Sequence, residues 1–358
     1  MLGAVSSGGF AVAVTGTHGK TTTSAGLAFV LSETGKDPTA LIGGHIPQFG
    51  GSNIRLGESD CVVMEADESD GSFTHLNPSA ILLTNVEAEH MDHHGSMEQL
   101  LETYQAFLGK ISADQALVFC SDDEHAARLS EGLACRSISY GIDSGDYRVT
   151  GSTRTTGGME VEIGWKGNKT RFVARLQGRH NALNLAGIFA MAMDMGLEER
   201  EVVEALSRFE GVARRQQYLG KLGDCLLFDD YAHHPTEIRA TLSMFRERYE
   251  SPITVVFQPH LYSRTAYFQE AFADALRLAD RVFLAEIYGS REAPVDGVSS
   301  ELILKHLNGH GNVFRLQNWR DMDTWFKPDM VQEGVLITMG AGDITELGPM
   351  LLNRWGKI

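Results

Sequence analysis

The chain has 358 residues, of which 43% are hydrophobic and 22% are charged, a composition that fits a globular protein of two or three domains and disfavours a disordered or collagen-like chain. Its 31 Lys and Arg residues against 47 Asp and Glu residues give a formal net charge of −16. Nucleic acid is therefore not expected as a partner, because binding to a phosphate backbone needs a basic surface.

Seven short apolar runs, each followed by polar or glycine-rich residues, mark the expected strands. Continuous apolar runs are typical of parallel strands buried on both faces, and helical periodicity at 96–108 and 265–279 favours intervening helices, which predicts an α/β fold. In such sheets, ligands bind beyond the carboxyl ends of the strands. The runs are AVAVTG (11–16), CVVMEA (61–66), AILLTN (80–85), CLLFDD (225–230), ITVVFQ (253–258), RVFLAE (281–286) and GVLITM (334–339).

The first run leads into a loop, GTHGKTT (16–22), and then into an apolar helical stretch, 24–31, that Gly35 closes. A glycine-rich loop between a strand and a helix offers backbone N–H groups to phosphate oxygens. Lys20 adds a positive charge, and Thr21 adds a hydroxyl group for Mg²⁺. The spacing is two residues shorter than the common G-x-x-x-x-G-K-[ST] loop. The alternative is a glycine turn that only caps a helix, but strand, glycines, Lys and hydroxyl residues all occur in the order that phosphate binding requires.

Four acidic residues follow the second apolar run. Such a cluster next to a triphosphate is tolerated only if cations bridge the two, and Mg²⁺ is the natural cation because it prefers oxygen ligands. The alternative is an acidic loop that is merely solvated. The residues are Glu65, Asp67, Glu68 and Asp70.

The third apolar run is followed by Glu89, His90 and Asp92. The histidines raise zinc as an alternative, but a hard cation with phosphate partners needs mostly oxygen ligands, with one imidazole as an acceptable addition. We therefore expect Mg²⁺ here, and we expect His93 and His94 to be exposed.

The pattern changes between about 146 and 176, where alternating runs punctuated by Gly and Thr predict antiparallel hairpins that extend the first sheet. A helix is predicted from about Asn181 to Met195, with Gly196 as its left-handed stop. A second series of strands and helices begins near Gly211. We therefore expect two domains, 1–211 and 212–358, with a hinge near residue 212 and with their carboxyl-end faces opposed across a cleft.

The cysteines show no CxxC spacing, and three of them lie in apolar runs, so we expect buried free thiols in a reducing compartment. The first residues carry no basic stretch followed by a long apolar run, and the chain has no uninterrupted apolar run of about 18 residues. We therefore expect a cytoplasmic protein without membrane insertion; the sequence does not indicate its oligomeric state. The cysteines are Cys61, Cys120, Cys135 and Cys225.

Eight motifs resemble those of the Mur ligase family, in the same order and at approximately the same spacing, from about residue 1 to the end of the chain. Within that family they most resemble the branch that joins L-alanine to UDP-N-acetylmuramate in peptidoglycan synthesis. The resemblance implies an amide ligase that uses ATP and Mg²⁺, with a central P-loop-type ATPase domain followed by a C-terminal Rossmann-like α/β domain. The motifs are GTHGKTTT, EADESDGSF, NVEAEHMD, GRHNALN, GVARRQQ, DDYAHHPTEI, FQPHLYSRT and GAGDI.

The resemblance also implies roles for residues of the first domain. Lys20 and its loop hold the β- and γ-phosphates of ATP. Thr21 and Glu65 coordinate one Mg²⁺, with Glu68 as the alternative to Glu65, and His90 binds a second Mg²⁺ that bridges the γ-phosphate and the substrate carboxylate. The other loop residues implied are Gly16, Thr17, His18, Gly19 and Thr22. The residues that match the adenine-reading segment are His180, Asn181 and Asn184.

In the second domain, the resemblance implies that Asp230 and Tyr231 lie near the ribose and the base, and that Arg214 or Arg215 contacts phosphate. The residues implied to position the substrate and the amino acid are His233, His234, His260 and Arg264. The residues implied in catalysis are Lys20, His90, His234 and Arg264.

The implied reaction activates a carboxylate, which is a poor electrophile. The carboxylate attacks the γ-phosphoryl group to form an acyl phosphate, while Mg²⁺ and Lys20 neutralise charge on the transferring oxygens. The amine of L-alanine then attacks the acyl carbon, and phosphate leaves. Closure of the second domain about the hinge is expected to exclude water from the acyl phosphate. The sequence does not indicate which group accepts the proton of the alanine ammonium.

Three departures from the family pattern bear on substrate binding. Leu261 stands in QPHLYSR where the family commonly has arginine, and Gly289, Ser290 and Ala293 depart from the family in YGSREAP. Family members begin with a UDP-binding domain of roughly 100 residues, which this sequence lacks. Met1 therefore resembles an internal methionine of a truncated gene product, and we expect a complete ATP and Mg²⁺ site with reduced affinity for UDP-N-acetylmuramate.

Other functions share part of this pattern. A murein tripeptide recycling ligase has most of the motifs, although its segment at QPHLYSRT differs, and folylpolyglutamate synthase is a weaker match. A GTPase-type switch or an ATP-dependent motor also uses a phosphate loop but has no role for DESD, EHMD and YAHHP. A non-catalytic ATP-binding remnant is the remaining alternative.

Overall fold

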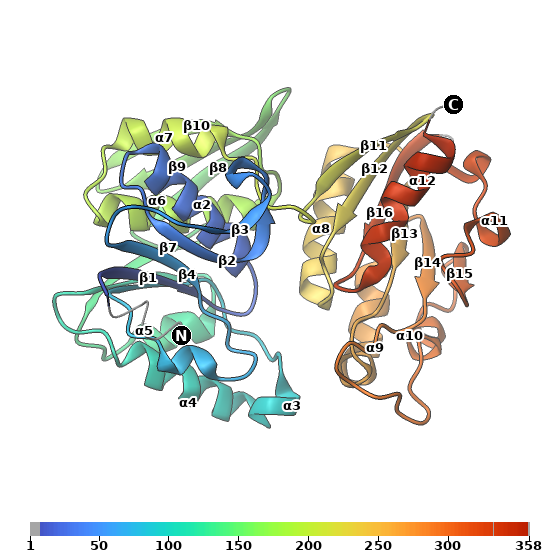
Figure 1. Ribbon diagram of the computed structural model, residues 1–358, viewed down its shortest axis with the longest axis horizontal. Helices are drawn as coiled ribbons and strands as arrows, with labels where there is room; N and C mark the ends of the chain where they lie inside the picture. The colour runs from blue at the N-terminus through green and yellow to red at the C-terminus, as the bar shows by residue number, and fades with distance from the viewer. Residues whose placement is uncertain (1–7, 332, 357–358) are drawn as a thin grey trace. The chain divides into compact units, whose positions relative to one another are not determined.

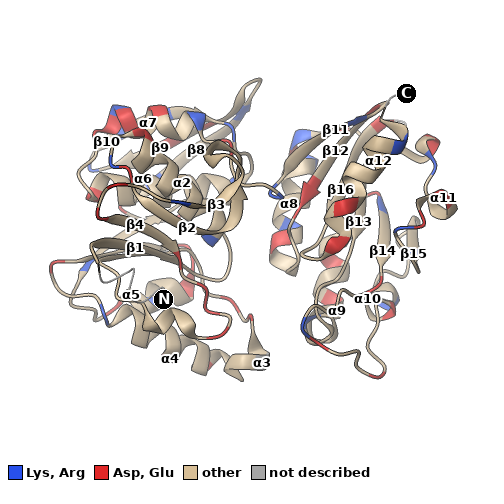
Figure 2. Ribbon diagram, in the orientation of Figure 1, with Lys and Arg blue, Asp and Glu red and all other residues tan. Residues whose placement is uncertain are grey.

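The computed structural model describes residues 8–331 and 333–356 (Figure 1). The chain divides into two compact units, Met1–Ala213 and Arg214–Ile358, and each is described by itself. The predicted junction at Met1 lies outside the described residues. Figure 2 shows Lys and Arg interspersed with Asp and Glu along the elements of each unit, so the net charge of −16 is spread over the chain.

The first unit is built on one mixed sheet, in which β1 (Phe10–Thr15) lies between β4 (Cys61–Glu65) and β5 (Ala80–Leu83) and runs parallel to both. The other strands are β2 (Thr39–Ile46), β3 (Ser52–Arg55), β6 (Ala116–Cys120), β7 (Arg136–Gly141), β8 (Tyr147–Thr155), β9 (Gly158–Trp165) and β10 (Asn168–Ala174). Within the described residues the order is β10-β9-β8-β7-β6-β5-β1-β4-β2-β3. Strands β8, β9 and β10 pair antiparallel, as predicted for the extension.

Helices cover both faces of this sheet because successive strand side chains point to opposite faces. Val12 and Val14 pack in one buried cluster with α2, α6 and α7, whereas Ala11 and Ala13 pack in another with α4 and α5 (Figure 1). The helical elements are α2 (Lys20–Glu33), α3 (Met91–His94), α4 (Met97–Leu108), α5 (Glu124–Ser130), α6 (Arg179–Asp194), α7 (Glu199–Arg208), η1 (Pro47–Phe49) and η2 (Ser72–His75).

The second unit has a smaller sheet, also covered by helices on both faces. Its elements are β11 (Gln217–Leu222), β12 (Asp224–Asp230), β13 (Ile253–Phe257), β14 (Arg281–Ala285), β15 (Val313–Leu316), β16 (Glu333–Met339), α8 (Pro235–Arg248), α9 (Tyr262–Leu276), α10 (Glu301–His306), α11 (Met322–Trp325), α12 (Leu347–Trp355), η3 (Pro328–Val331) and η4 (Asp343–Glu346). In the described part, the strand order is β11-β12-β16-β13-β14-β15, and only β11 pairs antiparallel. Val255 faces a buried cluster with α8 and α9, and Val256 faces one with α12.

The structure confirms the α/β class and the seven predicted strands. The helices predicted around 24–31, 96–108, 181–195 and 265–279 are present as α2, α4, α6 and α9. The four cysteines are buried and free, as expected. Among the described residues, every helix is too short or too polar to cross a membrane.

Candidate active site

The loop between β1 and α2 depends on two glycines. Gly19 has φ 83°, a left-handed conformation, and a Cβ atom there would lie 2.7 Å from Asn184 Oδ1. Gly16 has φ 125°, and a Cβ atom there would lie 2.2 Å from Thr84 Oγ1. Both positions therefore require glycine, because a side chain would be strained in its backbone conformation and would also collide with a neighbour.

The end of β5 holds this loop in place. The backbone N–H of Thr17 donates to the Asn85 carbonyl at 2.8 Å, and the N–H of His18 donates to Asn85 Oδ1 at 2.9 Å. Asn85 Nδ2 and Thr84 Oγ1 both donate to the His18 carbonyl, at 3.0 and 2.7 Å. Sequence reasoning missed Thr84 and Asn85 as loop supports, although both belong to the predicted AILLTN run.

The N-terminus of α2 has no side-chain cap, which leaves its first N–H groups suited to a ligand. Its N-cap residue, Gly19, provides no side-chain cap, and the first intrahelical bond runs from Thr23 N to the Gly19 carbonyl. The N–H groups of the first helical turn lack partners within the helix, and the helix dipole makes this end positive. The first turn, which carries Lys20, Thr21 and Thr22, is thus suited to bind an anion such as phosphate.

Lys20 lies in an acidic, buried setting. Its ammonium donates to both carboxylate oxygens of Glu68, at 2.9 and 3.1 Å, and to the carbonyls of Gly16 and Thr17, at 2.6 and 3.0 Å. Burial alone lowers the pKa of Lys20, but Glu68, Asp67 and Glu65 together raise it above its ordinary value. Lys20 therefore remains charged at neutral pH.

Glu68 is buried, with 1% of its side chain exposed. Burial raises the pKa of Glu68, and the opposing effect of Lys20 is smaller. A carboxylate in this position needs a positive partner, which Lys20 supplies in this structure and a divalent cation would also supply.

The two candidate carboxylates of the acidic loop occupy different places. Glu65 Oε1 accepts a hydrogen bond from Thr21 Oγ1 at 2.9 Å, and Glu65 Oε2 accepts one from the backbone N–H of Gly43 at 2.7 Å. Glu68 instead lies with Asp67 and His90, and the ligand atoms of these three residues are all within 4.8 Å of one another. Glu65 and Glu68 thus have different partners in this structure.

Asp67, Glu68 and His90 form a donor set that fits a hard divalent cation such as Mg²⁺, since two carboxylates supply oxygen and the imidazole adds one nitrogen. Asp67 is exposed, Glu68 is buried and His90 is half-buried. Sequence reasoning placed Asp67 in the acidic cluster but did not single it out as a ligand. The side chain of Asp92, an earlier candidate, lies outside the described residues.

The two neighbouring histidines differ in burial. His93 is exposed, as predicted, but His94 is only 5% exposed, so the prediction that it is exposed was wrong. The reason is a contact: His94 Nε2 lies 2.9 Å from the backbone carbonyl of Glu68. The one-turn helix α3 directs the two consecutive side chains to different surroundings.

The N-terminus of α6 adjoins the loop between β1 and α2 through Asn184, whose side chain lies next to Gly19. Asn184 Nδ2 donates to Asn181 Oδ1 at 3.3 Å, and Asn181 Nδ2 donates to the Gln177 carbonyl at 2.8 Å. Both asparagines are buried, whereas His180 is half-buried. Their role in reading adenine stays a prediction.

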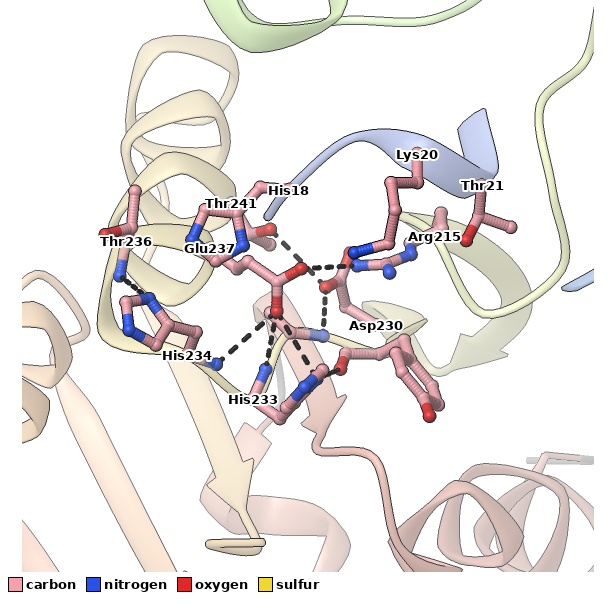
Figure 3. Close-up of polar contacts among 12 residues, drawn as sticks. His18, Lys20, Thr21, Arg215, Asp230, His233, His234, Thr236, Glu237 and Thr241 are labelled. Atoms are coloured by element: carbon pink, nitrogen blue, oxygen red, sulfur yellow. Dashed lines mark hydrogen bonds and ion pairs between the residues drawn. The ribbon is translucent and has the colours of Figure 1, made fainter. Parts of the chain in front are cut away.

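In the second unit, Asp230 lies at the end of β12 with 2% exposure. Asp230 Oδ2 accepts from Gln216 N at 2.7 Å, and Oδ1 accepts from Ala232 N at 2.8 Å. Oδ1 also accepts from Thr241 Oγ1 at 3.4 Å (Figure 3). Burial raises the pKa of Asp230 to about 6, although Arg215 opposes this shift. The Asp230 carboxylate thus accepts hydrogen bonds from neighbouring residues of the second unit, and this structural role adds to the ligand role that the motif implies.

Tyr231 is flanked by the two arginines that the sequence left as alternatives. The guanidinium carbons of Arg214 and Arg215 lie 4.8 and 5.0 Å from the centre of its ring. Arg214 donates to the carbonyls of Gly340 and Gly342, whereas Arg215 forms an ion pair with Glu237 at 3.2 Å (Figure 3).

The histidines after β12 and β13 form two groups. The rings of His233 and His260 are 5.7 Å apart, and His260 Nδ1 lies 3.0 Å from Nη1 of Arg264, which is 7% exposed. His234 instead caps α8, accepting from Thr236 N at 3.4 Å (Figure 3). Its ring packs on Phe268.

Leu261, one of the departures from the family pattern, is the N-cap residue that precedes α9. It is 4% exposed, has φ 70°, and its N–H donates to the Tyr288 carbonyl at 3.0 Å. Its side chain is therefore buried.

Comparisons with known proteins agree with this architecture. The profile of the Mur ligase middle domain matches residues 14–192, and that of the Mur ligase glutamate ligase domain matches residues 214–342. UDP-N-acetylmuramate–L-alanine ligases of Paenarthrobacter aurescens and Thermobifida fusca are 40% and 41% identical, over 99% of this chain and 77% of each relative. The structure of the UDP-N-acetylmuramate-alanine ligase MurC from Thermotoga maritima matches with a TM-score of 0.81 and 28% identity, over 98% of this chain and 76% of that one. The resemblance read from the eight motifs is confirmed, and the chain belongs to the Mur ligase family.

Proposed function

We propose that the chain is an ATP-dependent ligase that joins L-alanine to the carboxylate of UDP-N-acetylmuramate. The observation that carries the proposal is the loop around Lys20, which combines an uncapped helix N-terminus, a charged ammonium and adjacent carboxylates. Relatives about 40% identical over 99% of the chain bear the name of this reaction. Phosphoryl transfer needs this combination of positive charge and metal ligands around the phosphates.

The first turn of α2 and Lys20 are proposed to bind the β- and γ-phosphates of ATP. The Lys20 ammonium donates to Glu68 and to two loop carbonyls in this structure, so binding of a γ-phosphate oxygen would replace at least one of these partners. Glu65 and Thr21 are proposed to hold one Mg²⁺, and Asp67, Glu68 and His90 a second. Bound Mg²⁺ supplies positive charge that stabilises the oxygens of the transferring phosphoryl group.

The reaction proceeds in two proposed steps. A carboxylate oxygen of UDP-N-acetylmuramate attacks the γ-phosphorus, the bond from that phosphorus to ADP breaks, and an acyl phosphate forms. The neutral amine nitrogen of L-alanine then attacks the acyl carbon, the bond from that carbon to the phosphate oxygen breaks, and the proton lost by the nitrogen leaves with the phosphate as hydrogen phosphate. Lys20 stabilises negative charge in the first step because its ammonium carries a positive charge next to the phosphates.

Residues of the second unit are proposed to position the substrates. His233, His260 and Arg264 form one group of imidazole and guanidinium donors, which suits a carboxylate or phosphate of the substrate. His234 contributes from the start of α8, where its backbone and side chain already cap the helix.

Phosphate release from ATP by the full chain tests this function. It is measured with UDP-N-acetylmuramate and L-alanine together, with each omitted in turn, and with murein tripeptide in place of L-alanine. We expect release only when both UDP-N-acetylmuramate and L-alanine are present. Preference for the tripeptide would favour a recycling ligase, release without an amino acid would favour a switch or motor, and no release at all would favour a non-catalytic remnant; each result contradicts the proposal.

A further inference from the structure

His94 contacts two members of the candidate metal cluster, Glu68 and His90, although it is not itself one of the candidate ligands. Its side-chain Nε2 lies 2.9 Å from the backbone carbonyl oxygen of Glu68. Its backbone N–H donates to the carbonyl of His90 at 3.0 Å. One buried residue therefore joins the loop that follows β4 to the loop that follows β5.

The contact with Glu68 determines that Nε2 of the His94 ring carries a hydrogen. A carbonyl oxygen only accepts hydrogen bonds, so Nε2 must carry the hydrogen and donate it. The same carbonyl also accepts from the backbone N–H of Gly71 at 3.0 Å, which uses both of its lone pairs. The Glu68 backbone is thus held from two directions, once within its own loop and once by His94.

The backbone of His90 is stabilised by hydrogen bonds from the residues of α3. It has φ 56°, a left-handed conformation that is uncommon for a residue with a side chain. The N–H groups of His93 and His94 donate to its carbonyl at 2.9 and 3.0 Å, which stabilises that conformation as the start of α3.

We propose that His94 is a positioning residue, which sets the separation of Glu68 and His90 and thereby the affinity of the Asp67–Glu68–His90 cluster for a divalent cation. When a residue that hydrogen-bonds to metal ligands and so orients them is lost, the metal affinity commonly falls about 10- to 100-fold. The inference deepens the proposed function, since it rests on this cluster being a metal site.

The test compares four variants with the wild type, using Mn²⁺ alone as the probe and electron paramagnetic resonance of free Mn²⁺ as the readout. His94→Leu removes the donor, His94→Gln keeps an N–H at a similar reach, and His94→Asn carries its N–H closer to the backbone. His93→Leu is the matched control, because His93 is the exposed neighbour. We expect the Mn²⁺ Kd to rise about tenfold in His94→Leu and His94→Asn, and to stay within about threefold of the wild type in His94→Gln and His93→Leu.

A second readout separates positioning from loss of folding. Turnover measured against Mg²⁺ concentration should show a raised half-saturation point for His94→Leu, with kcat recovered at high Mg²⁺. If His94→Leu does not fold, the contrast between His94→Gln and His94→Asn decides. Equal Mn²⁺ affinity across the His94 variants, or no Mn²⁺ binding by the wild type, would overturn the inference. Absence of ligase turnover with the predicted Mn²⁺ pattern would instead contradict the proposed reaction alone.

Discussion

Asp230 is a carboxyl group that the fold buries among hydrogen-bond donors, so its protonation is linked to stability. Its pKa in the folded chain is about 6, against an ordinary value of 3.8. The folded state therefore holds a proton between these values that the unfolded state has lost. Stability from this group is fully present below about pH 4 and is lost as the pH rises through about 6.

We predict that the free energy of unfolding falls by about 2 to 3 kcal/mol from pH 4 to pH 7 through Asp230, because one pKa unit corresponds to about 1.4 kcal/mol. Asp230→Asn should lack this component. Urea denaturation followed by tryptophan fluorescence measures it, since Trp319, Trp325 and Trp355 all lie in the second unit. The same pH dependence in both proteins would show that Asp230 does not titrate as described.

Two residues, Thr21 and His94, show which contacts could be predicted from the sequence and which could not. The family resemblance implied that Thr21 coordinates one Mg²⁺ together with Glu65 or, alternatively, Glu68. The structure places Thr21 Oγ1 in hydrogen-bond contact with Glu65, and the shared metal role stays a prediction. The burial of His94 was missed because it depends on a contact with a carbonyl 26 residues away. No local pattern in EHMDHHG distinguishes His94 from the exposed His93.

At the scale of elements, the start of α8 combines a helix cap with an ion pair. Glu237 Oε2 accepts from the backbone N–H groups of His233 and His234, at 3.1 and 3.4 Å, while Oε1 faces Arg215 at 3.2 Å (Figure 3). The Glu237 side chain, which is 11% exposed, therefore stabilises the start of α8 and also links it to Arg215 in the segment before β11.

We predict that Glu237→Ala lowers the free energy of unfolding by about 2 kcal/mol, because a lost cap costs about 1 kcal/mol and Arg215 also loses its partner. Glu237→Gln, which keeps an oxygen acceptor but no charge, should lose about half as much. Urea denaturation at neutral pH measures both. An alanine variant as stable as the wild type would contradict this account of the helix terminus.

The elements that could be predicted were those whose pattern is local. Apolar runs buried on both faces mark the central strands, and all seven are present. The edge strand β3 was missed because its sequence is polar and solvent faces it; its Ile54 is 51% exposed. The central strand β6 was also missed, although its run ALVFC is apolar and buried and its pattern is therefore local. Helix α2 begins at Lys20, before the apolar stretch, because the glycine loop sets its start despite three consecutive threonines.

At the scale of the whole molecule, most candidate residues of both units follow parallel strands, as the general rule for α/β sheets requires. The exceptions lie at the start of α6, which follows the antiparallel strand β10, and just before β11; they are His180, Asn181, Asn184, Arg214 and Arg215. The first unit uses the loops after β1, β4 and β5, and the second uses those after β12 and β13. The structure divides the chain between Ala213 and Arg214, two residues beyond the expected boundary after residue 211. Membership of the Mur ligase family rests on both units, since a family profile matches each.

The central claim is that the terminal phosphates of ATP bind at Lys20. Isothermal titration of Mg-ATP into the wild type, Lys20→Ala and Lys36→Ala tests it, with Lys36 as an exposed lysine for control. We predict that Lys20→Ala binds Mg-ATP at least about tenfold more weakly, with turnover lower by about 100-fold or more, because a preorganised charge at the transferring group is lost. Lys36→Ala should match the wild type. Unchanged nucleotide affinity and turnover in Lys20→Ala would contradict the account.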